Sequence, residues 1–302
     1  MNIRDLLSCV VYKGYTISFE NNIISIFDNH ATHIIQLNIH TQQENIQIFI
    51  NCASYLGCIE LLNAIYDIYP SYYDYRMSLG YACTNNQIHV LYWLYDKHLI
   101  YDYCDGFHDH VAAKGYVNVL KFFIDRKLPL KLTNFAIDMA SGNGHIHMLD
   151  ILIQYTQEYS KLALNLSILH GHTNSIIWWL NSKLPLNYDH TFVDRLCEYG
   201  LEDIINTWLQ HDKEFIYSEN AIDLAIKNGH YNILFKWPLK YPIKYSYKAI
   251  EYACNNDRID VLQWFVDHNL PIYLPHDISK FKSQNVVDWL INYKMCKLDV
   301  HN

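Results

Sequence analysis

Residues 134–153 read NFAIDMASGNGHIHMLDILI, and this stretch decides the fold because its pattern returns about every 29 residues. It predicts two short helices, one around Ile137–Ala140 and one around Met148–Leu152, joined at Gly144. The residue just past a helix C-terminus usually takes the left-handed conformation, which costs a residue with a side chain about 1–2 kcal/mol and costs glycine very little. A repeated hinge therefore predicts a repeated Gly, Asn or Asp.

The hinge recurs at nine positions, and eight of them carry Gly, Asn or Asp while the ninth is a weak match. The positions are Gly57, Asn86, Gly115, Gly144, Gly171, Gly200, Gly229, Asp257 and Lys282. The spacings between them are 29, 29, 29, 27, 29, 29, 28 and 25 residues. The residue choice thus agrees with the conformation that the hinge requires.

Apolar columns follow every hinge at the same distances. Five residues after the hinges lie Leu62, Leu91, Leu120, Leu149, Ile176, Ile205, Leu234, Leu262 and Val287. Eight residues after lie Ile65, Leu94, Phe123, Leu152, Trp179, Trp208, Trp237, Phe265 and Leu290. The fourth position is also mostly apolar, so the three columns form one helical stripe. They predict a second helix after every hinge.

The first helix of each unit is indicated by what precedes the hinge. Small or apolar residues lie four positions before it: Ala53, Ala82, Val111, Ala140, Ser167, Leu196, Ala225 and Ala253. Residues typical of helix N-caps lie further upstream: Asp74, Asp105, Thr133, Ser160, Asp189, Ser218, Ser246 and Asp277. Prolines are expected to stop the second helices because they have no N–H: Pro129, Pro185, Pro242 and Pro271.

Composition restricts the class of protein. The chain has 302 residues, 51% hydrophobic, with a net charge of −8 and no Lys/Arg run, which argues against a nucleic-acid partner. It has neither a secretory leader nor 18 uninterrupted apolar residues, so we expect no membrane association. Its eight cysteines include no CxxC pair and suit reduced thiols in the cytoplasm. The expected class is a soluble, cytoplasmic, all-α protein.

The repeating units resemble ankyrin repeats, in the divergent short form found in giant DNA viruses and protists. The matching stretches are ASGNGHIHMLDILI at 140–153, AIKNGHYNILFKW at 225–237, ILHGHTNSIIWWL at 168–180, VAAKGYVNVLKFFI at 111–124 and ACNNDRIDVLQWF at 253–265. The resemblance covers about residues 43–293 and implies a helix–turn–helix solenoid of about 8–9 repeats. The chain lacks the Thr-Pro-Leu-His helix opening and has a period shorter than the usual one of about 33.

Both ends depart from the repeat. Residues 1–42 are expected to form an N-terminal cap or appendage, within which TISFENNIISIF at 16–27 predicts a β-hairpin about an Asn-Asn turn. Residues 43–302 are expected to form the solenoid. From about Asp277 the polar residues Lys282, Ser283 and Gln284 predict a C-terminal cap that faces water.

The sequence contains no motif that predicts catalysis, a metal or a cofactor. Histidines follow three hinges, at Gly144, Gly171 and Gly229, and the ankyrin resemblance implies that they belong to the turn. The stretch DYCDGFHDH at 102–110 is the densest group of candidate ligands, but it has no second Cys/His group at ligand spacing. Nucleophile elbows, phosphate-binding loops and His-Glu-x-x-His are absent. We expect no enzyme, no cofactor and no metal.

Tyrosines recur in the loops between units. The residue 15 positions after the hinges is mostly apolar and is expected to be core: Tyr72, Tyr101, Leu130, Tyr159, Leu186, Phe215 and Ile272. The next three positions offer tyrosines of the kind enriched at binding hot spots. The candidate protein-binding residues are Tyr73, Tyr75, Tyr103, Tyr188, Tyr217, Tyr245, Tyr247 and Tyr273.

The expected function is a protein–protein interaction scaffold. The resemblance implies a viral or protist protein that binds a host or cellular protein, as a monomer or with weak self-association. One alternative is a structural component that assembles with itself, for example in a virion. Another is an enzyme whose site is built from distant repeats, which the sequence does not reveal.

Overall fold

The structure is a computed structural model, and it describes residues 11–12, 15–20, 23–27, 33–38, 42–68, 74–101, 103, 106–238, 240–273 and 277–299. From Gln42 onward its regular elements are all helices, which confirms the all-α class for that part of the chain. No helix in the described ranges is both long and apolar enough to cross a membrane.

The helices come in consecutive pairs, each with a first and a second member. The first helices are α2 (Gln42–Leu56), α4 (Arg76–Thr84), α6 (Phe107–Lys114), α8 (Asn134–Gly142), α10 (Leu162–Leu169), α12 (His190–Glu198), α14 (Asn220–Lys227) and α16 (Tyr247–Asn255). The second helices are α3 (Ile59–Ile68), α5 (Ile88–Asp96), α7 (Val117–Asp125), α9 (Ile146–Leu152), α11 (Thr173–Asn181), α13 (Glu202–Gln210), α15 (Tyr231–Phe235) and α17 (Ile259–Asp267). A longer helix, α18 (Gln284–Asp299), follows the last pair.

The N-terminal segment contains four strands in one antiparallel sheet of order β1-β2-β3-β4. They are β1 (Val11–Tyr12), β2 (Tyr15–Glu20), β3 (Ile23–Phe27) and β4 (His33–Asn38). The predicted hairpin corresponds to β2 and β3, where Glu20 pairs with Ile23 and leaves two residues for the connection. Those two residues, the predicted Asn-Asn turn, lie outside the described residues. Strands β1 and β4 were not predicted.

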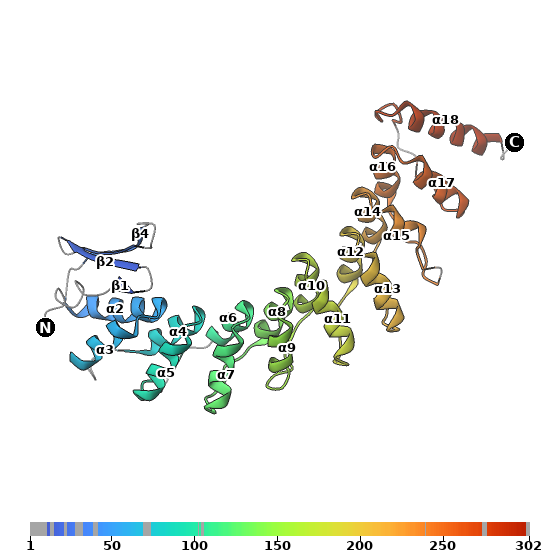
Figure 1. Ribbon diagram of the computed structural model, residues 1–302. Coiled ribbons are helices and arrows are strands. Elements are labelled where there is room, and N and C mark those ends of the chain that lie inside the picture. The colour runs from blue at the N-terminus through green and yellow to red at the C-terminus, as the bar shows by residue number, and fades with distance from the viewer. Residues whose placement is uncertain are drawn as a thin grey trace. The chain divides into compact units, whose positions relative to one another are not determined.

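Contacts divide the chain into two units, Met1–Ile137 with His147–Gln157, and Asp138–Ile146 with Glu158–Asn302. In the first unit, α2, α4 and α6 pack side by side, α3, α5 and α7 form a second row, and each first helix contacts its own second helix (Figure 1). In the second unit α10, α12, α14 and α16 form the corresponding row, and each again contacts its own partner, α11, α13, α15 or α17. Helices α8 and α9 contribute residues to both units.

The predicted hinges are left-handed. All eight positions from Gly57 to Asp257 have φ between 55° and 84°. At Gly144 the hinge N–H donates to the carbonyl of Ser141 at 3.0 Å, and the N–H of His145 donates to the carbonyl of Ala140 at 2.9 Å. This hydrogen-bond pair is a Schellman motif, which satisfies carbonyls that a helix end otherwise leaves free. The small residue four positions before the hinge therefore supplies an acceptor as well as space.

The prediction of a ninth hinge at Lys282 is wrong. Lys282 is described and is not among the residues with positive φ. No helix lies between α17 and α18 in the described residues, because only a turn at 278–282 precedes α18. The segment from Asp277 thus differs from the other pairs, in agreement with a terminal segment of distinct structure.

A second set of left-handed residues ends the second helices, and the sequence did not reveal it. Its members lie 12 positions after a hinge and have φ between 52° and 61°: His98, Lys127, Lys183, Asp212 and Asn269. At Lys127 the same Schellman pair forms, with the N–H of Leu128 donating to the carbonyl of Phe123 at 2.9 Å. Helix α7 has already ended at Asp125, so Pro129 is not what stops it. The predicted role of the prolines is wrong.

The predicted columns form the core. All nine residues eight positions after the hinges are buried, as are eight of the nine at the fifth position, Val287 being half-buried. Ser167 and Ser175 are polar members of two apolar columns and are fully buried. Both hydroxyls donate to the carbonyl of Ser141, at 3.0 and 2.8 Å, and Trp179 Nε1 donates to Ser141 Oγ at 2.8 Å. A buried hydroxyl is tolerated where it is hydrogen-bonded.

Candidate functional site

Five of the loop tyrosines donate a hydrogen bond to the protein's own backbone. Each hydroxyl donates to a carbonyl in the loop that ends the same helix pair: Tyr103 to Pro129 (2.5 Å), Tyr159 to Pro185 (2.6 Å), Tyr188 to Glu214 (3.1 Å), Tyr245 to Pro271 (2.6 Å), and Tyr217 to Pro242. Their rings contact the aromatic residue eight positions after the hinge, as Tyr188 does with Trp208 at 4.9 Å between ring centroids. Burial raises the pKa of each of these hydroxyls. The tyrosines join successive loops.

The candidate binding tyrosines that the structure describes therefore separate into three groups by burial. Tyr75, Tyr103 and Tyr217 are buried, and we remove them from the candidate surface because a partner cannot reach them. Tyr188 and Tyr245 are half-buried, and their hydroxyls are already used. Tyr247 and Tyr273 are 59% and 51% exposed and remain available. Tyr73 lies outside the described residues.

The loop position 15 residues after the hinges is only partly core. Phe215 and Ile272 are buried, whereas Leu130, Tyr159 and Leu186 are half-buried. Tyr101 is 62% exposed, so the prediction of core is wrong there. Tyr72 lies outside the described residues.

The predicted N-caps Asp189 and Ser246 are confirmed, and Thr133 directly precedes α8. Asp74, Ser160 and Ser218 lie one residue before the N-caps of α4, α10 and α14, whereas Asp277 lies in a turn that is not followed directly by a helix. Seven side chains accept a hydrogen bond from the backbone N–H two residues later, at 2.9–3.2 Å: Asp74, Thr133, Ser160, Asp189, Ser218, Ser246 and Asp277. The eighth, Asp105, lies outside the described residues. These contacts satisfy orphan donors at the starts of the helices.

A carboxylate from the preceding helix pair holds four of these N-caps, a contact that the sequence did not predict. Each carboxylate accepts from the backbone N–H and from the hydroxyl of the N-cap: Asp109 with Thr133, Asp138 with Ser160, Asp194 with Ser218, and Asp223 with Ser246. We call this contact the Asp–hydroxyl clamp. Asp138 is fully buried, and burial raises its pKa although the hydrogen bonds from Ser160 lower it. The clamp joins one first helix to the start of the next.

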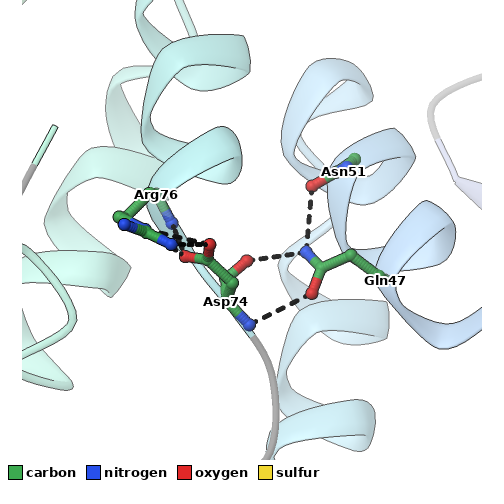
Figure 2. A network of polar contacts seen from close by, with 4 residues as sticks. All are labelled: Gln47, Asn51, Asp74 and Arg76. Atoms are coloured by element: carbon green, nitrogen blue, oxygen red, sulfur yellow. Dashed lines mark hydrogen bonds and ion pairs between the residues drawn. The ribbon is translucent and has the colours of Figure 1, made fainter. Parts of the chain in front are cut away.

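Gln47 provides a neutral version of the clamp at the start of the first unit. Its Nε2 donates to the carbonyl of Asp74 at 2.6 Å, and its Oε1 accepts from the Asp74 N–H at 3.0 Å (Figure 2). The same Nε2 donates to Asn51 Oδ1 at 3.3 Å, while Arg76 forms an ion pair with Asp74 at 2.7 Å. The amide therefore connects α2 to the N-cap of α4.

Exposed apolar side chains recur at the starts of first helices. In the first unit, Met77 and Phe135 lie in the first turns of α4 and α8. In the second unit, Leu162 and Tyr247 begin α10 and α16. All four are at least 41% exposed. They lie one to three positions after a predicted N-cap, at Asp74, Thr133, Ser160 and Ser246.

A groove of about 240 Å³ lies in the second unit near two hinges. Its lining includes Gly200, Gly229, Tyr231, Phe235 and Arg258. The Arg258 guanidinium lies 3.7 Å from the Tyr231 ring centroid. Arg258 also pairs with Asp260, and Glu202 at the rim pairs with Lys236 at 2.5 Å. The charged groups Glu202 and Arg258 of the lining thus already have partners within the chain.

The stretch 102–110 does not assemble into a metal or catalytic centre in its described part. His108 is fully buried and its Nδ1 accepts from the Lys131 N–H at 3.2 Å, whereas His110 is exposed. Asp109 is used by the clamp. Burial lowers the pKa of His108 to about 4, so the imidazole is neutral at pH 7. Across the described residues no group of three or more His, Cys, Asp or Glu side chains is placed to hold a metal ion.

The described cysteines are free thiols. They are Cys52, Cys58, Cys83, Cys197 and Cys254. Burial raises the pKa of every one, to about 11 for Cys52 and about 12 for Cys254. Raised pKa values make thiols poor nucleophiles at neutral pH, because the thiolate is the reactive form.

No protein-family model matches the chain, and comparison with curated proteins finds no significant relative. The ankyrin resemblance thus has no support from these comparisons.

Proposed function

We propose that the chain is a non-enzymatic, ankyrin-like solenoid that binds another protein in a eukaryotic cytoplasm, as a viral or protist interaction protein. Support for the solenoid comes from helix pairs that share one left-handed hinge, the same buried columns and the Asp–hydroxyl clamp. Such pairs cannot bury their apolar stripe alone and are stabilised by stacking against their neighbours.

The observation that carries the binding proposal is the recurrent exposure of Met77, Phe135, Leu162 and Tyr247. Single exposed apolar residues are common and need no explanation. Here exposed apolar residues recur in the first turn of four of the first helices, α4, α8, α10 and α16, where burial of the core does not require them. Tyr101 in the first unit and Tyr273 in the second are exposed as well.

Affinity capture from cells, followed by mass spectrometry, tests this proposal. The test variant carries Leu162→Ser and Tyr247→Ser, and the matched control carries Ile177→Ser and Phe235→Ser, which are exposed on second helices of the same unit. We expect the test variant to lose a partner that wild type and control retain, with all three proteins equally helical. Equal capture by the test variant and wild type contradicts the proposal.

Self-assembly is the second candidate, favoured by Ile291 and Met295, which are exposed on α18 after the last pair. Light scattering over a range of concentrations tests it. Growth of mass with concentration that Met295→Glu abolishes supports it, and a monomer at every concentration contradicts it.

A further inference from the structure

Two cations in the first unit lie over aromatic rings of the preceding second helix. The Arg126 guanidinium, at the C-terminus of α7, lies 4.4 Å from the Phe122 ring centroid, 4.5 Å from that of Tyr92 and 5.0 Å from that of Tyr95. Lys97 occupies the same place one helix pair earlier, 4.6 Å from the Tyr66 ring centroid. We call these residues the cation–aromatic row: Tyr66, Tyr92, Tyr95, Lys97, Phe122 and Arg126.

The row has cations but no anion. Within the described residues neither Lys97 nor Arg126 is a member of an ion pair. Arg126 Nε is enclosed without a hydrogen-bond partner, while its two terminal nitrogens are not among the enclosed atoms. The Arg126 guanidinium therefore stacks on the rings while its two terminal nitrogens stay open to a partner.

We propose that the cation–aromatic row docks an acidic segment of a partner protein. A guanidinium already stacked on rings has lost most of its side-chain freedom, so a carboxylate can bind its planar fork at little further entropic cost. Tyr92 and Tyr95 are exposed beside it and add the aromatic area typical of hot spots. The proposal rests on the proposed protein-binding function and names the chemistry of the partner, on a different helix row from Met77 and Phe135.

The spacing of the row suits an extended peptide. Lys97 and Arg126 belong to adjacent packed helices, whose axes lie about 8–10 Å apart in proteins. An extended chain in the polyproline II conformation has three residues per turn and rises about 3.1 Å per residue, so carboxylates three residues apart lie on one face about 9 Å apart. Asp96 and Asp125 are exposed and each directly precedes one of the cations. Their negative charges disfavour a continuous phosphate backbone, which carries a charge at every nucleotide.

Fluorescence anisotropy with the full-length protein tests the proposal. The probe is a short labelled peptide with two glutamates three residues apart, and the controls are its glutamine twin and a single-stranded oligouridine RNA of equal length. The variants are Arg126→Gln, Arg126→Lys and, as a matched control, Lys161→Gln in the second unit. We expect the glutamate peptide to bind about tenfold more tightly than its twin, and Arg126→Gln to remove that difference. Arg126→Lys should keep part of the difference in affinity between the two peptides, and Lys161→Gln should keep all of it.

A measurement on the wild type covers the case in which Arg126→Gln fails to fold. The glutamate peptide should shift the NMR signal of the Arg126 Nε–H and leave that of Arg258 in place. The proposal is overturned if the two peptides bind equally, if the RNA binds more tightly, if the Arg126 signal does not move, or if no binding occurs up to about 1 mM. Leu162→Ser with Tyr247→Ser should bind the peptide normally, so failure here is distinguishable from failure of the proposed function.

Discussion

Alanine at Gly171 and at Gly80 makes the same chemical change in two backbones, and we expect opposite effects on stability. Gly171 is a hinge with φ of 77°, and an added Cβ would meet nothing within 4 Å. The left-handed backbone costs alanine about 1–2 kcal/mol, and the stiffer unfolded chain returns about 0.4–1 kcal/mol. Gly171→Ala should therefore lower the free energy of unfolding by about 1 kcal/mol. Gly80 lies inside α4 with equally open space, so Gly80→Ala should gain about 0.5–1 kcal/mol.

Gly142 adds a steric case without backbone strain. It lies in α8, and an added Cβ would come 2.6 Å from the Cβ of Leu166 on α10. Overpacking costs about 1–3 kcal/mol and exceeds the helix-propensity gain of about 0.5–1 kcal/mol. We expect Gly142→Ala to lose about 1 kcal/mol.

Urea unfolding, followed by circular dichroism and by tryptophan fluorescence, measures these three effects. Trp93 lies in the first unit and the other six tryptophans lie in the second, so fluorescence reports mainly on Gly142 and Gly171. Circular dichroism also detects Gly80→Ala in the first unit. If Gly171→Ala proves as stable as wild type, the left-handed hinge is refuted. Destabilisation by Gly80→Ala would refute the open environment of that glycine.

Three further predictions concern single residues: Lys127, Asp223 and His108. Lys127→Gly should raise stability by about 0.5 kcal/mol, because it relieves a left-handed backbone at a small entropic cost, and a lower midpoint in thermal unfolding would contradict this. Asp223→Ala should lower the free energy of unfolding by about 2 kcal/mol, because it leaves two donors of Ser246 unpaired. In a double-mutant cycle the losses from Asp223→Ala and Ser246→Ala should not add, and full additivity would contradict the clamp. His108 has a pKa of about 4 in the folded protein against 6.5 in the unfolded chain, so only the unfolded state takes up its proton between those values. Its contribution of about 3 kcal/mol is complete above pH 6.5 and is lost as pH falls toward 4, and urea titrations of His108→Leu should lack that slope.

The hinges, the columns and the N-caps were predictable because each depends on a residue type at a fixed distance along the chain. Gly144 identifies a left-handed position, Leu149 and Leu152 identify a buried face, and Ser160 identifies a helix start. These are local requirements, and the repeat presents each of them eight or nine times.

Two of the candidate tyrosines, Tyr103 and Tyr217, were misjudged because they are buried and their hydroxyls bond to backbone atoms. Nothing in the residue types around Tyr103 indicates that its hydroxyl reaches the carbonyl of Pro129, 26 residues away. The clamp did leave a signal, since Asp138 and Asp223 both lie six residues before a hinge and 22 or 23 residues before a serine N-cap. The second left-handed set left none, because its members share no residue type.

Hydrogen–deuterium exchange of the protein alone and with its captured partner tests the central claim most directly. That claim is that the starts of the first helices bind a partner while the tyrosine contacts and the clamps hold the helix pairs together. We predict that the partner protects the first turns of α10 and α16, around Leu162 and Tyr247, and leaves α11 unchanged. Unaltered exchange at both first turns, with a partner bound, would contradict the claim.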